Sequence, residues 1–377
     1  MMLKKITRNK NSSFEMDMTY TAKSNIGFGN VIDYIANFDT SNKLIFVDPV
    51  VLVKQPDLLN LETIDQSVTL VPTNIHEGSK NLDSTIEVLR VMEDKGIGRR
   101  SELVCAIGGG ALMDTVSFAA SIFRRGISVT KIPTTLLGIV DAAIGIKTGV
   151  NFSGQRNRLG SYHFDFDVLL DPNLMDGISK GMIRQGLGEI FKIATIKGKK
   201  LFKCLKENIS NLEDTEFYKT SAGKDIMSAA IELMLEELHS NPRETDLKRC
   251  VDFGHSFCPL VEMESLKRIG SRTIPHGYAV AYDCVLTTAL SRNRQLINES
   301  NYKEILELYR PFEFDFANEL YRENNLLWAS FLELTKHRGF NQNLPIPTEI
   351  GSYTFLQDVS FDELKIANEL IQSEFNQ

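Results

Sequence analysis

The sequence is poor in cysteine and lacks any pair of cysteines at metal-binding spacing. Its five cysteines are scattered over 377 residues, and no two of them form a CxxC arrangement. Neither a disulfide framework nor a cysteine-ligated zinc site is indicated. Isolated cysteines of this kind are ordinarily buried, reduced thiols, so we expect the protein to lie in the cytoplasm.

Long apolar runs and an excess of positive charge are also missing. No stretch approaches the roughly 18 consecutive apolar residues of a membrane-spanning helix. The basic N-terminus lacks the apolar run of a signal peptide. With a formal net charge of −7, the chain is a poor partner for nucleic acid or an anionic membrane. Local basic clusters could still bind a small anionic substrate.

What the sequence does contain is an alternation of short apolar runs with helical patterns in its first half. Buried strands are predicted at 43–48, 67–73, 102–107 and 128–133. Between them, apolar residues recur at helical spacing over 81–95 and 111–125. This alternation predicts an α/β domain with a parallel, Rossmann-like sheet.

Helical patterns alone continue beyond residue 178. They cover 180–197, 217–238 and 279–297. A short polar stretch with a glycine, residues 172–179, marks the change. We therefore predict an α/β domain over 1–175 and an all-α domain over 176–377.

A glycine triplet follows one of the predicted strands directly. The strand ends at Ile107, and Gly108, Gly109 and Gly110 lead into a helix with Asp114 in its first turn. Glycines let backbone N–H groups approach a phosphate, and a helix N-terminus adds partial positive charge. The triplet is not a GxGxxG fingerprint, and a tight turn without a ligand is the alternative. Its place between strand and helix favours a nucleotide site.

Polar residues at two other strand ends fit the same site. Thr134 and Thr135 follow the strand that closes with Pro133, and Asp48 ends an earlier strand. Parallel sheets bind ligands at the carboxyl ends of their strands, where Asp48 could accept hydrogen bonds from ribose hydroxyls.

Two of the six histidines and one glutamate form a possible metal set. His255 and His276 each stand beside a glycine, and Glu189 lies within the segment RQGLGEIFK. Two imidazoles and a carboxylate suit a catalytic divalent metal, but these residues are too far apart in sequence to form a motif. Lys192 shares the helical face of Glu189; such a pair is usually solvated, although the apolar, glycine-rich surroundings argue against exposure.

Together these residues resemble one family, the sugar-phosphate cyclases related to dehydroquinate synthase. The matching segments are AIGGGALMDTVSFAA, RRGISVTKIPTTLLGIVDAAIGIKTGVN, QRNRLGSYH, GLGEIFK, VDFGHSF and PHGYAVA. Their order and spacing are those of the family. The resemblance implies bound NAD, a divalent metal (Zn²⁺ or Co²⁺), a sugar-phosphate substrate and a homodimer.

The resemblance also implies a role for each matching residue. The metal ligands are expected to be Glu189, His255 and His276. The NAD site is expected to include Asp48, Glu77, Lys80, Gly108, Gly109, Gly110, Asp114, Thr134 and Thr135. The substrate pocket is expected to include Asp141, Lys147, Asn157 and Lys192. Further basic residues match phosphate-binding positions: Arg156, Lys336 near the C-terminus, and Arg125, which would reach the site of a neighbouring subunit.

Departures from dehydroquinate synthase bear on the substrate. Asp252 stands where that enzyme typically has an amide, and Pro259 stands where it has a second histidine. A carboxylate there suits a polyhydroxylated neutral group, whose hydroxyls it can bind, better than a second anion. This favours the branch that converts sedoheptulose 7-phosphate to 2-epi-5-epi-valiolone. Tyr278, where the family usually has glutamate after His–Gly, is a misfit.

The expected reaction of that branch is a phosphate-eliminating cyclisation, which makes the enzyme a lyase. Transient oxidation by NAD precedes phosphate elimination, re-reduction and an intramolecular aldol closure. Three alternatives stay open at this point. Another cyclase of the family, dehydroquinate synthase or desmethyl-4-deoxygadusol synthase, would give a different product. A metal-dependent NAD polyol dehydrogenase would show net NADH formation, and a non-catalytic metabolite-binding protein would show no turnover.

Overall fold

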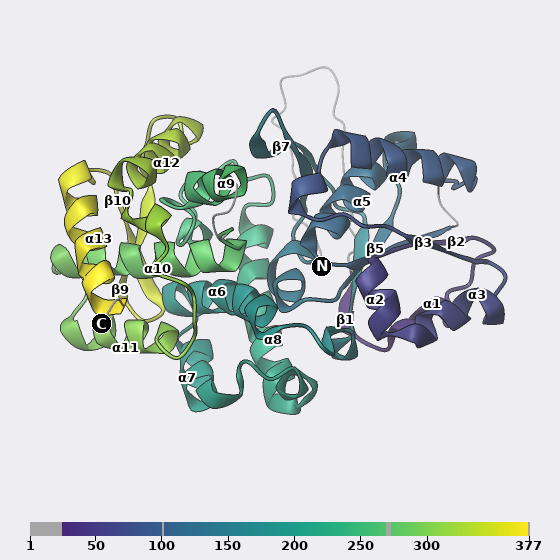
Figure 1. Ribbon diagram of the computed structural model, residues 1–377, viewed down its shortest axis with the longest axis horizontal. Coiled ribbons are helices and arrows are strands. Elements are labelled where there is room, and N and C mark those ends of the chain that lie inside the picture. Colours follow the sequence, from purple (N-terminus) through teal and green to yellow (C-terminus); the bar gives the residue numbers. More distant parts are fainter. Residues whose placement is uncertain (1–24, 100–101, 269–272, 376–377) are drawn as a thin grey trace, which may run out of the picture. The chain divides into compact units, whose positions relative to one another are not determined.

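The computed structural model describes residues 25–99, 102–268 and 273–375, which fall into two compact units (Figure 1). The first unit holds the described residues up to Pro133, with Gly145–Phe152 and Asn157–Asp171. The second holds Thr134–Ile144, Ser153–Arg156 and the chain from Pro172 onward. Two short segments before residue 175 thus belong to the second unit. The N-terminal stretch in which we expected no signal peptide lies outside the described residues.

A six-stranded parallel sheet forms the centre of the first unit, which confirms the predicted α/β class. Its strand order is β1-β8-β5-β4-β2-β3, and each neighbouring pair is parallel. The strands are β1 (Ile26–Phe28), β2 (Lys43–Val47), β3 (Val68–Pro72), β4 (Leu103–Gly108), β5 (Val129–Pro133) and β8 (Phe166–Leu170). Every residue of β2, β4 and β5 is buried, as expected for strands covered on both faces.

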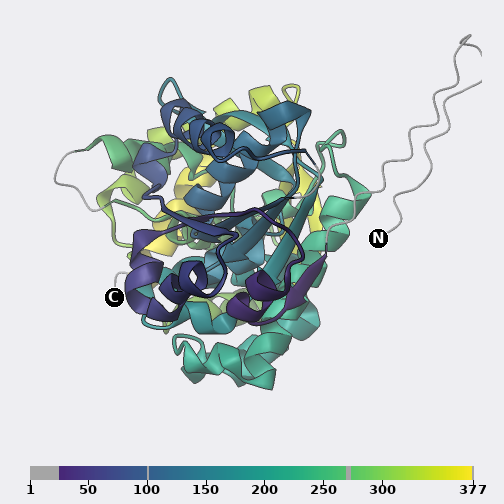
Figure 2. The same cartoon turned by 90° about the vertical axis from the view of Figure 1, so that its right-hand side faces the viewer.

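Helices cover both faces of this sheet. They are α1 (Val31–Asn37), α2 (Pro49–Lys54), α3 (Leu61–Ile64), α4 (Leu82–Asp94) and α5 (Gly110–Ile122). Figure 2 shows α4 and α5 on one side of the strands and α1 and α2 on the other. A separate two-stranded sheet pairs β6 (Lys147–Phe152) with β7 (Gln155–Tyr162).

The second unit is mainly helical, as expected, and contains a hairpin that the sequence did not indicate. Its helices are α6 (Lys180–Ile196), α7 (Lys199–Glu207), α8 (Ser221–Ser240), α9 (Pro259–Lys267), α10 (His276–Asn293), α11 (Glu299–Tyr309), α12 (Asn324–His337) and α13 (Phe361–Phe375). The hairpin joins β9 (Leu344–Glu349) to β10 (Ser352–Leu356). None of the helices in the described part of the chain is long and apolar enough to cross a membrane.

Helix α10 is the core of this unit. Every residue from Ala279 to Ser291 is buried, because α6, α13, α11 and β9 all pack against it. A helix that is enclosed on all sides can be apolar all round, and the sequence AVAYDCVLTTAL follows that rule apart from Asp283 and the threonines.

Helices α6 and α10 meet through two glycines. A Cβ atom on Gly188 would lie 2.1 Å from the carbonyl oxygen of Gly277. A Cβ atom on Gly277 would lie 2.0 Å from the carbonyl oxygen of Gln185. The two backbones are therefore in direct contact, and only glycine allows that approach.

We predict that Gly188→Ala destabilises the protein by about 3 kcal/mol, because the new methyl group must push α10 away and overpacking outweighs the gain in helix propensity. Gly181→Ala on the same helix is the control, since its Cβ would meet only ordinary contacts, the nearest at 3.5 Å. Urea unfolding measures both. Equal stability of the two variants would contradict this account of the crossing.

Candidate active site

The glycine turn of the first unit leaves a helix N-terminus without a side-chain cap. Gly109 is the N-cap of α5 and supplies no cap, whereas Asn30, Asp48 and Asn81 cap α1, α2 and α4 with their side chains. A Cβ atom on Gly109 would meet nothing within 4 Å. The space and the N–H groups that an anion needs are therefore both present.

Asp48 lies beside this turn, as the sequence predicts. Its backbone N–H donates to the carbonyl of Ile107 at 2.9 Å, and a Cβ on Gly108 would lie 3.3 Å from the Cβ of Asp48. The Asp48 side chain accepts the N–H of Val50 and so begins α2. Adjacent parallel strands thus bring Asp48 and the glycines to one edge of the sheet.

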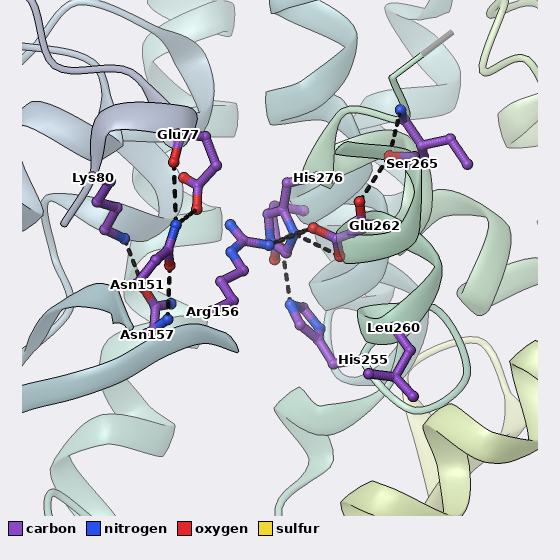
Figure 3. Close-up of polar contacts among 12 residues, drawn as sticks. Glu77, Lys80, Asn151, Arg156, Asn157, His255, Leu260, Glu262, Ser265 and His276 are labelled. Carbon is purple, nitrogen blue, oxygen red and sulfur yellow. Dashed lines mark hydrogen bonds and ion pairs between the residues drawn. The ribbon is translucent and has the colours of Figure 1, made fainter. Parts of the chain in front are cut away.

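A hydrogen-bonded chain in the first unit links residues that are distant in sequence. Lys80 is buried and its Nζ contacts Asp114 Oδ2 at 2.5 Å and Asn157 Oδ1 at 2.7 Å. Asn151, which sequence reasoning missed, donates to Glu77 Oε1 at 3.0 Å and accepts from the backbone N–H of Asn157 at 2.9 Å. Figure 3 shows Glu77, Lys80, Asn151 and Asn157 pointing toward one another.

The second unit brings the three expected metal ligands together. Glu189 comes from α6, His255 from the loop before α9, and His276 is the first residue of α10. Ligand atoms of the three residues all lie within 4.8 Å of one another. Glu189 Oε1 is 3.4 Å from His255 Nε2 and 3.2 Å from His276 Nε2. The contact between Gly188 and Gly277 explains this, because each glycine directly adjoins one of the ligands.

Glu189 directs one oxygen toward a lysine and the other toward the histidines. Lys192 Nζ holds Oε2 at 2.5 Å, and both side chains are buried, as their apolar surroundings predict. Oε1 is buried and accepts no hydrogen bond from the described residues. Burial raises the pKa of Glu189, but Lys192 and the two histidines outweigh it and hold that pKa well below its ordinary value. The carboxylate is therefore charged and has one oxygen to offer.

Glu262 on α9 orients His276, and sequence reasoning gave it no role. Both of its carboxylate oxygens lie 3.1 Å from His276 Nδ1. Arg156 Nη1 pairs with Glu262 Oε2 and lies 3.0 Å from His276 Nδ1 (Figure 3). A carboxylate at Nδ1 holds a hydrogen there, and Nε2 is then the nitrogen that faces Glu189. Glu262 thus supplies a carboxylate beside His276, in a chain that has Tyr278 where the family usually has glutamate.

The two histidines differ in their protonation. Burial and the charge of Lys192 lower the pKa of His255 to about 3. For His276 burial favours the neutral ring, but the carboxylates of Glu262 and Glu189 prevail and raise its pKa to about 9. The carboxylates of Glu262 and Glu189 thus favour a positive charge at His276, which either a proton or a bound metal ion can supply.

The negative charge of Asp252 is compensated by two arginines, which the sequence did not indicate. Its Oδ1 pairs with Arg249 at 2.5 Å and its Oδ2 with Arg338 at 2.6 Å. Burial raises the pKa of Asp252, and the two arginines outweigh that effect and lower it. Arg249 also pairs with Glu244, so two arginines and two carboxylates balance. Asp252 therefore does not present an uncompensated negative charge.

The other expected site residues have varied surroundings. Asp141 lies in the π-helical turn Gly138–Ala142, close enough to Lys192 to help raise the pKa of that amine against the effect of burial. Thr135 accepts the N–H of Gly138 at 3.0 Å, and Thr134 is buried beside it. Lys147 is exposed at the start of β6.

Two expected phosphate-binding residues lie at the surface. Arg125 is exposed at the end of the short helix Phe123–Arg125, with φ of 70°. Lys336 near the end of α12 is exposed and its Nζ lies 3.0 Å from Glu333. Neither lies in the hydrogen-bonded sets described above.

Comparison with known proteins defines the class. Residues 70–185 match the family described as 3-dehydroquinate synthase N-terminal, and residues 186–337 match 3-dehydroquinate synthase C-terminal. The chain therefore belongs to the dehydroquinate synthase-like family of sugar-phosphate cyclases, as the resemblance in sequence predicted. It is an enzyme of that family by sequence and by fold.

Its relatives within the family include 2-epi-5-epi-valiolone synthases. One from Streptomyces albus is 38% identical over 82% of this chain and 75% of the relative. One from an Actinomyces species is 38% identical over 78% of this chain and 77% of the relative. The solved structure of ValA, the 2-epi-5-epi-valiolone synthase of Streptomyces hygroscopicus with NAD⁺ and Zn²⁺ bound, is 32% identical, has a TM-score of 0.84, and covers 97% of this chain and 99% of its own.

We predict that Arg338→Met lowers the free energy of unfolding by about 3 kcal/mol, because it leaves the buried Asp252 with one cationic partner in place of two. Lys336→Met, two positions earlier in the last turn of α12, removes an exposed ion pair and should change stability by less than about 1 kcal/mol. Urea unfolding followed by circular dichroism compares them. An equal loss of unfolding free energy in the two variants would show that the buried pair of Arg338 with Asp252 contributes no more than an exposed one.

Proposed function

We propose that this protein converts sedoheptulose 7-phosphate to 2-epi-5-epi-valiolone and phosphate, with NAD and a divalent metal bound. The observation that carries the proposal is the cluster of buried Glu189 with the partly exposed His255 and His276, in which one carboxylate oxygen accepts no hydrogen bond from the described residues. It occurs in a chain that is 38% identical to a 2-epi-5-epi-valiolone synthase. Because phosphate leaves without net redox change, the proposed enzyme is a lyase.

The second unit fits a catalytic Zn²⁺ or Co²⁺ ion. Two imidazoles and one carboxylate are a common donor set for such ions, and three protein ligands leave a position for substrate oxygens. Glu262 fixes the His276 tautomer that a metal ligand requires. Glu189 Oε2 is held by Lys192, so Oε1 is the oxygen that would bind the ion.

The first unit fits the pyrophosphate of NAD. The α5 N-terminus has no side-chain cap, and the space above Gly109 is open to a phosphate oxygen. Asp48 would accept hydrogen bonds from ribose hydroxyls, and Lys80 would place Asp114 and Asn157 around the nucleotide and substrate. We assign Glu77, Thr134 and Thr135 to the same site.

The chain's own residues would hold and polarise the sugar phosphate. When bound, NAD supplies a transient hydride acceptor and the divalent metal supplies a positive charge beside the oxygen being oxidised. Lys192 is charged and paired with Glu189, so it would donate hydrogen bonds to a substrate hydroxyl without acting as a base. Asp141 would accept from a neighbouring hydroxyl. Lys147, Asn157 and Arg156 would bind phosphate oxygens.

The revised charges around Asp252 still favour a substrate without a carboxylate. Arg249 is engaged by Asp252 and Glu244, and Arg338 by Asp252 and the carbonyl of Gln342. A heptulosonate carboxylate near this group would find both guanidiniums already paired with acids, and Pro259 offers no donor where dehydroquinate synthase has histidine. Partly buried, poorly paired ions cost several kcal/mol.

We also propose a homodimer in which Arg125 reaches the phosphate site of the partner. Its exposure at the end of the short helix Phe123–Arg125, which follows α5, supports this role, and analytical ultracentrifugation tests the assembly. Lys336, which is exposed on α12, stays a proposed contact to phosphate. The five cysteines form no disulfide, which supports a reducing, cytoplasmic location that cell fractionation can test.

We predict that Glu189→Gln weakens zinc binding by more than the roughly 10–100-fold typical of an outer-shell change, and abolishes turnover. Gln keeps the shape of the side chain but removes the negative charge that pairs with Lys192 and would bind the metal. Isothermal titration of the metal-free protein with Zn²⁺ measures the affinity, and circular dichroism checks the fold. Glu333→Gln on the surface of α12 is the matched control. Unchanged affinity in the folded Glu189 variant would remove this residue from the ligand set.

The decisive experiment offers the enzyme sedoheptulose 7-phosphate and the heptulosonate phosphate used by dehydroquinate synthase, in competition. We expect one phosphate released per cyclic C7 ketone and no accumulation of NADH. The kcat/KM for the heptulosonate should be at least about 100-fold lower than that for sedoheptulose 7-phosphate. This ratio corresponds to about 3 kcal/mol for a poorly paired anion.

Preferential formation of dehydroquinate would overturn the substrate assignment and leave the family unchanged. Net NADH formation would instead identify a dehydrogenase. Mass spectrometry of the product and absorbance of NADH separate these outcomes.

A further inference from the structure

One buried carboxylate of α10 binds the loop that follows His255. Asp283 is fully buried, about two turns after His276 on the same helix. Its Oδ2 accepts three consecutive backbone N–H groups, from Ser256 at 2.8 Å, Phe257 at 2.5 Å and Cys258 at 2.9 Å. Three donors on one oxygen fix the direction of this loop more tightly than a single hydrogen bond could.

The loop is also held on the other side of His255. Gly254 has φ of 81°, and a Cβ there would lie 2.7 Å from Cys284 Sγ and 3.0 Å from Val280. The backbone on both sides of His255 therefore rests on α10. By contrast, the ring itself has a weak outer partner, since Nδ1 lies 3.4 Å from the carbonyl of Phe253.

We propose that Asp283 is a positioning residue that sets the affinity of the metal site by fixing His255, although it touches neither the metal nor the substrate. The inference rests on the proposed metal site. His276 is oriented by Glu262 through its ring, whereas His255 is oriented through its backbone. A metal ligand must lie within a few tenths of an ångström of its place, so the support of the loop controls binding.

Replacement of Asp283 has a defined physical effect. In Asp283→Asn the side chain keeps its size, but the charge is lost, and an amide group turned toward the loop would oppose the three N–H donors. Buried N–H groups left without acceptors favour a shifted loop. Thr287, whose hydroxyl donates to Asp283 Oδ1 at 3.3 Å, offers a milder change as Thr287→Val.

The test measures zinc affinity of the full-length protein by competition with a chromophoric chelator, without reference to turnover. We expect Asp283→Asn to weaken zinc binding by about 10–100-fold, which is typical of replacing a residue that orients a metal ligand. Thr287→Val should weaken it by a few-fold. Thr288→Val is the matched control. It is equally buried on α10, and its hydroxyl donates to Cys284 within the helix, so zinc affinity should stay within about twofold.

A double-mutant cycle separates positioning from general loss of stability. If Asp283 acts through His255, then Asp283→Asn should weaken zinc binding no further in a His255→Ala background. Additive losses in the cycle would overturn the proposal, as would wild-type affinity in both the Asp283 and Thr287 variants. Unchanged zinc binding in His255→Ala itself would instead refute the proposed metal site, so the two failures are distinct.

Discussion

The contact between Gly188 and Gly277 is the constraint on which the candidate metal site depends. Two helix backbones touch there, with no room for a Cβ on either residue. Glu189 and His276 directly adjoin these glycines, so the crossing itself places a carboxylate beside an imidazole. A side chain at either glycine would separate the helices by more than the tolerance of a metal–ligand bond. Packing and chemistry are thus decided by the same contact.

Helix α10 then serves as the common reference for both histidines. It carries His276 at its first position and Asp283 further along, and Asp283 binds the loop that presents His255. Because α10 is buried from Ala279 to Ser291, it cannot shift without disturbing the core of the unit. Two of the polar residues inside this helix have partners that lead to this loop: Asp283 binds it, and Thr287 donates to Asp283.

Three buried acidic side chains of the second unit have cationic partners, whereas Asp283 accepts backbone N–H groups instead. Glu189 pairs with Lys192, Glu262 with Arg156, and Asp252 with two arginines. Buried pairs of this kind contribute little net stability, because desolvation offsets most of their attraction. Their effect is geometric. Each pair commits a carboxylate oxygen to one direction, and Glu189 Oε1 is left facing the histidines.

The sequence by itself determined the elements and the candidates. Its apolar runs predicted four of the six parallel strands and missed β1 and β8, and its patterns identified the glycine triplet, Glu189, His255 and His276. It missed the hairpin Leu344–Leu356, because alternating prolines in LPIPTE weaken a strand pattern. It also gave no role to Glu262 and treated Asp252 as uncompensated. Their partners Arg156 and Arg338 lie 106 and 86 residues away, and a pattern along the chain carries no information about which distant side chains meet. Only the tertiary structure decided those pairings, because it brings Arg156 of β7 to α9 and the residue after α12 to the turn that holds Asp252.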